Sequence, residues 1–412
     1  RERSIEKIDP KSSFKITVIF DLGNNKELNA ELPKKFDTEE EAMAFLTACK
    51  DADFSIEDLQ KKPGKKSPAP PFTTSTLQQE ASRKLGFSVS QTMSVAQKLY
   101  EAGLISYMRT DSVNLSQEAV DGAVKQIKSG YGDNYVNVRK FKTKSSSAQE
   151  AHEAIRPTNF AVTEPSADRN GIRLYELIWK RAIASQMADA QIEKTTAHIA
   201  ISTLDQRLSA YGEVITFDGF LSVYLESTDD EDEDEQKGML PPLTVGQSLK
   251  LKLMKAKQGY SRPPARFTEA SLVKQLEEMG IGRPSTYAPT ISTIQKRNYV
   301  EKEFREGKER AYRLLTLKSG EINEEDLTEI TGTEKNKLFP TNTAMVVNDF
   351  LVDHFPNVTS YGFTAEVEKE FDEIADGGKE WEKMIQSFYG EFHNKVEITE
   401  NIERSEIQSS RE

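Results

Sequence analysis

The chain has 412 residues, of which 36% are hydrophobic and 30% are charged, and its formal net charge is −12 at pH 7. This length exceeds that of one ordinary domain, so several structural units with a sizeable buried core are expected. The negative charge excludes a protein that coats nucleic acid along its whole surface, because Lys and Arg supply most of the non-specific affinity for phosphates.

The apolar residues and the single cysteine narrow the class of protein further. No stretch approaches about eighteen consecutive apolar residues, which predicts no membrane span, and no secretory signal peptide is visible. Cys49 has no partner for a disulfide, and no clustered spacing of Cys and His predicts a zinc site. We therefore expect a cytoplasmic protein. Because the chain begins at Arg1 and not at Met, we also expect it to be a piece of a longer protein.

The first 66 residues have a mainly β pattern. Alternating residues predict strands over 13–22 and 27–32, joined by a turn at Gly23-Asn24-Asn25. A helical period follows over 39–49. The segment from Lys61 to Pro71 is rich in Lys, Pro and Gly and predicts a domain border.

Residues 67–192 have a mainly helical pattern. Helices are expected over 77–85 and 90–102, each ended by a glycine, and residues 104–108 predict a short strand. Ser116 is expected to cap a further helix. The order helix–turn–helix–strand returns from Phe267, over 269–279, 286–296 and 298–302. Such units often present a helix or turn to nucleic acid, and they also occur as plain scaffold.

Between these two helical parts the β pattern returns. Strands are predicted over 196–203, 206–214, 221–226 and 248–253, around an acidic run from Asp229 to Glu235 that predicts a solvated loop. The sequence thus predicts a multidomain α+β protein with three parts. They are a β-rich hinge domain (1–66 and 193–260), an inserted helical, winged-helix-like domain (67–192) and a second, mainly helical domain (261–412).

The residues best suited to chemistry lie in one short segment, 103–112, which reads Gly-Leu-Ile-Ser-Tyr-Met-Arg-Thr-Asp-Ser. Tyr107 and Arg109 are two apart, so on a strand they would share one face. A fixed cation there favours a phenolate and also the extra charge on an attacked phosphate. A Tyr-x-Arg pair by itself is more often a strand aromatic beside a surface charge.

The whole string resembles the active-site signature of type IA DNA topoisomerases, whose tyrosine forms a 5′-phosphotyrosyl link with DNA. The resemblance covers nearly the whole chain. It implies that Tyr107 is the nucleophile and that Arg109 and Asp111 belong to the site, with Arg109 also binding DNA. A second string, 150–158, resembles the family too and implies that His152 lies beside Asp111. A His with an acidic partner could move the proton that a 3′-hydroxyl leaving group needs, and a structural His is the alternative.

Two further strings resemble the family. Residues 264–272 and 280–288 are similar to its DNA-strand-holding region, and this implies that Arg283, Ser285 and Thr286 bind DNA. A helix N-terminus is expected there, which favours phosphate binding, although capping alone would explain Ser285. Arg297, near the end of the same helix, is a further expected contact. In the fourth string, 71–78, capping explains the hydroxyls equally well, and we assign them no catalytic role.

The resemblance also implies parts that this sequence lacks. The family's N-terminal Toprim domain holds Mg²⁺ with an Asp-x-Asp pattern that has no convincing equivalent here, and one cysteine cannot form the family's zinc ribbons. We therefore expect no metal ligands in this chain and Mg²⁺ only as a cofactor of the full-length enzyme. This piece alone should not relax DNA. No GxxxxGK[ST] phosphate loop occurs, so the full-length enzyme should work without ATP.

The function implied by the resemblance is relaxation of negatively supercoiled DNA in the bacterial cytoplasm, at the nucleoid. A toroidal core would cut one strand, pass another strand through the break and reseal it. A non-catalytic module for single-stranded DNA, a tyrosine-dependent nuclease or recombinase, and a scaffold for protein partners are the alternatives. Rolling-circle nucleases need a His-x-His metal pair, whereas the four histidines here lie far apart in the sequence. Salt-dependent binding to a single-stranded oligonucleotide would separate the scaffold from the others.

Overall fold

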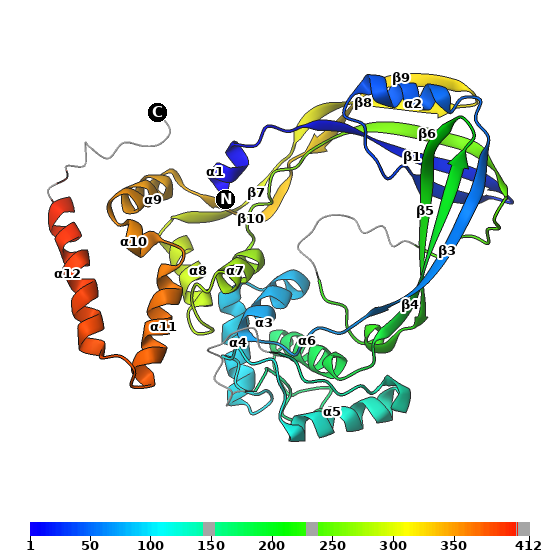
Figure 1. Ribbon diagram of the computed structural model, residues 1–412. Helices are drawn as coiled ribbons and strands as arrows, with labels where there is room; N and C mark the ends of the chain where they lie inside the picture. Colours follow the sequence, from blue (N-terminus) through cyan, green and yellow to red (C-terminus); the bar gives the residue numbers. More distant parts are fainter. Residues whose placement is uncertain (143–152, 228–237, 401, 403–412) are drawn as a thin grey trace.

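The computed structural model describes residues 1–142, 153–227, 238–400 and 402, and these form both helices and strands, as the sequence predicts. The acidic run from Asp229 to Glu235 and the candidate residue His152 lie outside the described residues. Figure 1 shows the strands gathered in one part of the molecule and the helices α3 to α6 in another, with β3 and β4 running between them.

The main sheet has eight strands in the order β1-β2-β5-β4-β3-β6-β8-β9, and β1 also pairs with β6. The strands β1, β2, β5, β4, β3 and β6 therefore close into a ring, and β8 and β9 extend from it. Their bounds are β1 (Ser12–Gly23), β2 (Lys26–Glu31), β3 (Phe54–Lys66), β4 (Ala190–Ile201), β5 (Leu204–Phe217), β6 (Ser248–Tyr260), β8 (Lys308–Lys318) and β9 (Glu321–Thr331).

The first hairpin forms where the sequence predicts it. Every second side chain of β1 is buried from Phe14 to Phe20, because successive side chains of a strand point to opposite faces. Gly23, Asn24 and Asn25 all have positive φ, the backbone region that Gly and Asn tolerate best. Helix α2 (Glu39–Ala48) adds its buried residues to the same apolar core as β1, which confirms the helix expected over 39–49.

β3 continues into the expected border segment, Lys61–Pro71, and ends at Lys66. Pro63 is in register with Glu193 of β4, and Gly64 with Ile192. Phe54 and Ser55 of β3 pair with β6, and Ile56 bonds to the turn before β6, so beyond Ile56 the strand pairs only with β4. A proline is tolerated on such an edge because its missing N–H can face away from the ladder.

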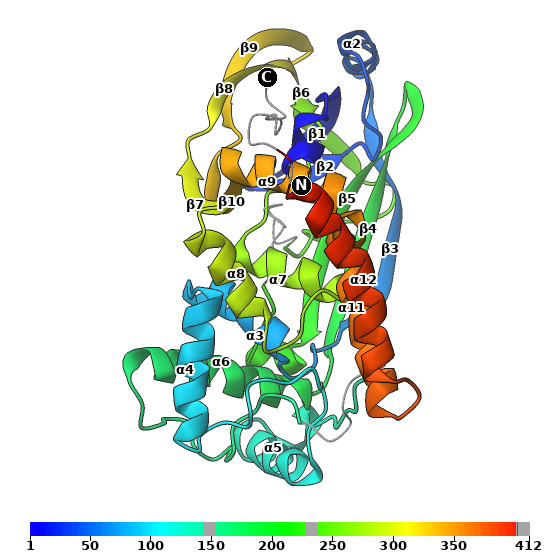
Figure 2. The ribbon, with the colours of Figure 1, turned by 90° about the vertical axis from the view of Figure 1, so that its left-hand side faces the viewer.

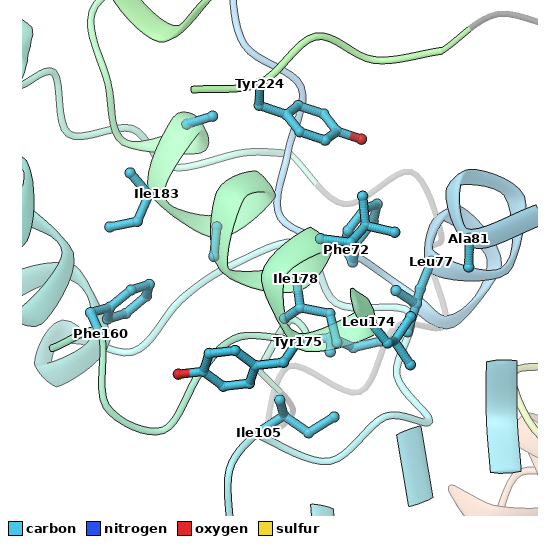
Figure 3. Close-up of a cluster of buried hydrophobic side chains, with 14 of the residues drawn as sticks. Phe72, Leu77, Ala81, Ile105, Phe160, Leu174, Tyr175, Ile178, Ile183 and Tyr224 are labelled. Carbon is cyan, nitrogen blue, oxygen red and sulfur yellow. The ribbon is translucent and has the colours of Figure 1, made fainter. Parts of the chain in front are cut away.

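The block between β3 and β4 is helical and has its own core. Its helices are α3 (Thr74–Glu80), which continues as a π-helical turn (Ala81–Leu85), α4 (Val89–Glu101), α5 (Gln117–Gly130) and α6 (Arg169–Ser185), with a short 3₁₀ turn at Asp133–Tyr135. Figure 3 shows Leu174, Tyr175 and Ile178 of α6 packed among Phe72, Leu77 and Ile105. Gly86 and Gly103 follow the two predicted helices with positive φ, and Ser116 caps α5, as expected.

The strand predicted over 221–226 is wrong. A 3₁₀ turn (Gly219–Ser222) covers the start of this segment, and residues 223–227 form no strand. Leu221, Val223 and Leu225 alternate in this segment, but the buried side chains are Tyr224 and the preceding Phe220, which are four residues apart and enter the core of the helical block. Alternation alone therefore misled the assignment.

The last part of the chain has more strand than expected. Besides α7 (Glu269–Glu278), α8 (Tyr287–Lys296), α9 (Asn342–His354), α10 (Pro356–Thr359), α11 (Phe363–Ala375) and α12 (Trp381–Thr399), it contributes β7 (Val300–Arg305), β10 (Glu334–Pro340), β8 and β9. None of the residues of β9 is fully buried, and its apolar residues, Ile322, Leu327 and Ile330, do not alternate with polar ones. The sequence therefore gives no strand pattern there. Strands β7 and β10 form a separate pair.

The N-terminal helix lies against this last part of the chain. Helix α1 (Glu2–Glu6) is joined to it by ion pairs from Glu2 to Arg266 and from Arg3 to Asp349. Rings of α11 and α12 meet at Phe363 and Phe388, 5.8 Å apart. In the described part of the chain, every helix is too short or too polar to cross a membrane.

Candidate active site

Tyr107 lies just beyond the end of α4. Gly103 ends this helix with φ of 71°, its N–H donates to the carbonyl of Tyr100 at 2.8 Å, and the N–H of Leu104 donates to Leu99 at 2.9 Å. The expected strand over 104–108 does not form, because Ile105 makes only an isolated bridge to Pro157. The tyrosine is therefore in an irregular loop and not on a strand.

The loop nevertheless alternates in exposure as a strand would. Tyr107 is 42% exposed, Met108 is 1% exposed, Arg109 is exposed and Thr110 is buried. The phenol and the guanidinium therefore both face outward, although no partner strand holds them. Among the described residues Arg109 forms no ion pair, so its charge is available to a phosphate.

Ser106 fixes the backbone on one side of Tyr107. Its hydroxyl donates to the carbonyl of Ala154 at 2.8 Å and accepts from the N–H of Arg156 at 2.9 Å. Its own N–H donates to the carbonyl of Arg156 at 2.9 Å. Ala154 and Arg156 of the second family-like string thus hold the backbone next to the tyrosine.

Thr74 fixes the backbone on the other side. Its buried hydroxyl donates to the carbonyl of Met108 at 2.7 Å and accepts from the N–H of Thr110 at 2.9 Å, and its own N–H donates to the carbonyl of Thr110 at 2.9 Å. Sequence reasoning missed this residue, because a run of hydroxyls before a helix indicates capping. Only Thr73 is the N-cap of α3, in a capping box with Thr76.

Glu153, which follows the undescribed His152 in the sequence, holds the same backbone segment in place. Glu153 accepts from the N–H of Ser116 at 2.6 Å and from the guanidinium of Arg156 at 2.9 Å. Burial alone would raise the pKa of Glu153, but the hydrogen bonds from Arg156 and Ser116 outweigh it and hold the pKa below its usual value. The position of His152 beside Asp111 stays a prediction.

The candidate DNA-binding residues surround α8. Thr286 is its N-cap but makes no capping bond, because its hydroxyl accepts from the N–H of Arg283 at 2.8 Å instead. The start of α8 thus has no side-chain cap, but the N–H of Tyr287 already donates to the carbonyl of Arg283 at 3.2 Å and Pro289 has no N–H, so among the described residues only the N–H of Ala288 is left to receive an anion. Ser285 is exposed and is not the cap, so capping does not account for it. Gly282 has φ of 83°, and an added Cβ would lie 3.0 Å from the Thr286 hydroxyl oxygen.

The two arginines near α8 lie at opposite ends of it. Arg283 precedes the helix and forms an ion pair with Glu368 of α11 at 3.4 Å. Arg297 is the C-cap and is exposed. A helix of this length measures about 15 Å, so the two guanidiniums cannot bind one phosphate together. They would have to contact different points along a strand.

The tyrosine loop and the α7–α8 turn are brought together by helix packing. Helix α3 packs on α7 and α4 on α8, as the two ribbon views agree (Figure 1, Figure 2). The hydroxyl of Ser75 donates to Glu277 at 2.7 Å, and buried Glu269 accepts from the N–H of Val89 at 2.9 Å. These bonds join segments about 200 residues apart in the sequence.

A buried phenol marks where the two parts meet. Burial raises the pKa of Tyr287 to about 12, with smaller contributions from the nearby carboxylates Glu277, Asp111 and Glu368 and an opposing one from Arg283. Asp111, from the tyrosine loop, therefore lies close to the start of α8. Sequence reasoning placed these residues in separate strings, and the packing of α3 and α4 on α7 and α8 joins them.

The described residues contain no group of three or more His, Cys, Asp or Glu that could hold a metal ion. The side chains present therefore do not fit Mg²⁺, and no step of the chemistry is assigned to a metal in this chain. The expectation that the full-length protein uses Mg²⁺ stays a prediction.

Comparison with known proteins identifies the family. A family model described as DNA topoisomerase matches residues 1–329. The chain belongs to the DNA topoisomerase family. This confirms the resemblance to type IA topoisomerases that the four strings indicate.

Individual topoisomerases resemble the chain over nearly its whole length. It is 43% identical to the prokaryotic-type DNA topoisomerase 1 of Acanthamoeba polyphaga mimivirus, over 88% of this chain and 44% of that protein. It is 40% identical to DNA topoisomerase 1 of Rickettsia typhi, over 99% of this chain and 51% of that protein. The structure of full-length topoisomerase I from Thermotoga maritima matches with a TM-score of 0.74 and 34% identity, over 96% of this chain and 60% of that one. The chain thus spans about half the length of the curated topoisomerases it matches.

Proposed function

We propose that this topoisomerase chain is the tyrosine-bearing core of an enzyme that relaxes negatively supercoiled DNA without ATP. The observation that carries the proposal is the mounting of Tyr107. Its side chain is exposed, while Ser106 and Thr74 fix the backbone on either side of it. A nucleophile needs this combination, because DNA must reach the phenol while the phenol stays in place.

The proposed chemistry exchanges one phosphoester for another. The oxygen of Tyr107 bonds to phosphorus, the bond from phosphorus to the 3′ oxygen breaks, and the phenol proton is lost as the leaving 3′ oxygen gains one. Arg109 stabilises the extra negative charge on phosphorus. Asp111 and His152 are the proposed groups for these proton transfers. Religation is the reverse attack by the 3′-hydroxyl, so the cycle conserves the bond energy and needs no ATP.

The proposed path of the single strand follows α8. One phosphate would lie at the start of α8, beside the side chains of Arg283, Ser285 and Thr286, and another near Arg297 at the far end. This path begins close to the tyrosine loop, since Asp111 lies near Tyr287. Backbone contacts of this kind hold the strand without reading its bases.

The proposed gate lies where α3 and α4 meet α7 and α8. The helical block is joined covalently to the rest through β3 and β4. Phe220 and Tyr224, which follow β5, also pack into its core, and its remaining attachment is the packing of α3 and α4 on α7 and α8. We assign the hinge to 1–66 and 193–260, the moving tyrosine domain to 67–192 and the partner surface to 261–412. The ribbon follows a closed course through these parts (Figure 1), which supports a toroidal core. The proposed place of action is the cytoplasmic nucleoid.

The deciding experiment is covalent capture by the full-length protein. A single-stranded oligonucleotide labelled at its 3′ end is mixed with protein and quenched with detergent, and labelled protein is counted. We expect an adduct with the natural protein and none with Tyr107→Phe. Tyr389→Phe, an exposed tyrosine on α12, is the matched control and should form a normal amount. An adduct with Tyr107→Phe, or one that carries only a 5′ label, would overturn the proposal. Binding without any adduct would favour a non-catalytic module for single-stranded DNA.

A further inference from the structure

We propose that Tyr100 is a positioning residue, whose ring holds the phenol of Tyr107 in the orientation needed for attack; this rests on the function proposed above. The ring centroids of the two tyrosines lie 5.2 Å apart with an interplanar angle of 64°, an edge-to-face pair. Aromatic rings prefer this arrangement at this distance, because the positive edge of one meets the negative face of the other.

The side chain of Tyr107 needs such a partner. Ser106 and Thr74 bond to backbone groups around it, and no hydrogen bond to the phenol oxygen is present among the described residues. A free side chain on a fixed backbone still samples several rotamers. Attack on phosphorus requires one geometry, so a neighbouring ring that favours it would raise the rate.

Tyr100 is itself well placed to be rigid. It occupies the last turn of α4, and its carbonyl accepts the N–H of Gly103, which ends the helix. Its ring therefore projects from a regular helix, while Tyr107 projects from a loop. The helix fixes the position of Tyr100, and the ring of Tyr100 in turn restricts the ring of Tyr107.

Simple core packing does not account for the pair. Tyr100 is 41% exposed, nearly the same as Tyr107, so neither ring is needed to fill the interior. The second helical unit has the same helix ending, where the N–H of Asn298 donates to the carbonyl of Gln295 at 3.0 Å. At that equivalent position the side chain is an amide that bonds to Glu269, not a ring. The aromatic residue occurs in the unit that has the nucleophile.

The experiment uses full-length protein in which Tyr100 is replaced by Leu, which removes the ring, or by Phe, which keeps it. Two quantities are measured for each: the single-turnover rate of adduct formation at saturating oligonucleotide, and the Kd of the same oligonucleotide. We expect Tyr100→Leu to slow adduct formation about 3- to 10-fold with Kd unchanged, and Tyr100→Phe to match the natural protein, as the strength of an edge-to-face pair suggests.

Every other outcome overturns the inference. An unchanged rate with Tyr100→Leu means that the ring has no positioning role. A weakened Kd with an unchanged rate makes Tyr100 a DNA contact instead. A rate equally low with Phe and Leu makes the hydroxyl, not the ring, the important group. Thermal unfolding of Tyr100→Leu and of a second ring-free variant, Tyr100→Met, excludes a folding defect. Failure of the proposed function would appear differently, as no adduct with the natural protein.

Discussion

The two helical units of the molecule, α3–α4 and α7–α8, begin and end in similar ways but continue into different structures. Each first helix has a threonine N-cap in a capping box, Thr73 with Thr76 and Thr268 with Ser271. Each second helix ends at a residue with positive φ, Gly103 or Asn298. After that point they diverge, because the first continues into the irregular loop of Tyr107 and the second into the strand β7.

The residue after each N-cap shows how the divergence arises. Thr74 points its hydroxyl at the tyrosine loop, whereas Glu269 points its carboxylate at the N-terminus of α4. Both positions are buried and both bond to another segment of chain. Local sequence thus builds the same scaffold twice, and the long-range bonds at this one position differ between the two copies.

The largest difference in stability is expected from replacing the phenylalanines that precede the two N-caps, Phe72 and Phe267, by alanine. Phe72 is fully buried and its ring lies 4.8 Å from the guanidinium of buried Arg181, while Phe267 is partly exposed. We expect Phe72→Ala to lower the free energy of unfolding by about 3–5 kcal/mol. Phe267→Ala should cost about 1 kcal/mol, since less apolar surface is lost. Thermal unfolding of both variants of the 412-residue chain measures the difference. Equal losses would mean that the two units are equally buried in solution.

A smaller effect should separate the two residues that follow the caps. Thr74→Val keeps the shape but leaves the carbonyl of Met108 and the N–H of Thr110 without their partner, which should cost about 1–3 kcal/mol. In the full-length protein it should also slow adduct formation by about tenfold or more, because the loop loses its anchor. Glu269→Gln keeps an acceptor for the N–H of Val89 and should cost less than about 1 kcal/mol. Normal adduct formation by Thr74→Val would contradict the anchoring role.

The smallest effect concerns the two helix ends. Gly103→Ala should cost about 1 kcal/mol, because a non-glycine residue is disfavoured at φ of 71°, and an added Cβ would meet no atom within 4 Å. Asn298→Gly should change stability by only a few tenths of a kcal/mol, since both residues tolerate this backbone region. Thermal unfolding measures both. An unchanged melting temperature for Gly103→Ala would show that the loop relaxes and does not depend on this helix ending.

Much of the scaffold could be predicted from sequence because its signals are local. The hairpin turn at Gly23–Asn25 and the helix endings at Gly86 and Gly103 depend on backbone preferences of single residues. Strand β9 escaped prediction because most of its residues are charged or polar and none is fully buried, whereas β8 has buried residues only near its end, at Leu315 and Leu317. The 221–226 segment was misread because its apolar residues alternate by coincidence.

The candidate site also has parts that local sequence indicates and parts that depend on long-range contacts. Tyr107 was found from its string of neighbours and not from periodicity, which wrongly placed it on a strand. Thr74 and Ser106 could not be assigned their roles, because their partners lie about 30 to 50 residues away in the sequence. Likewise, nothing in the spacing of Asp111 and Tyr287 predicts that one lies near the other. A family-like string points to the candidate nucleophile, and the fold shows which residues fix its backbone.

The pairing of β3 with β4 runs from Phe54 and Ile201 to Lys66 and Ala190, with one irregularity near Glu57. The two connections to the helical block are therefore a single ladder and not two independent tethers. Such a ladder resists lengthwise stretching, since many backbone bonds would have to shear together, but it can twist, and a bulge is where twist concentrates. In the function proposed above, the block would rotate on this stiff ladder, and Tyr107 would return along the same arc to the end of the cut strand.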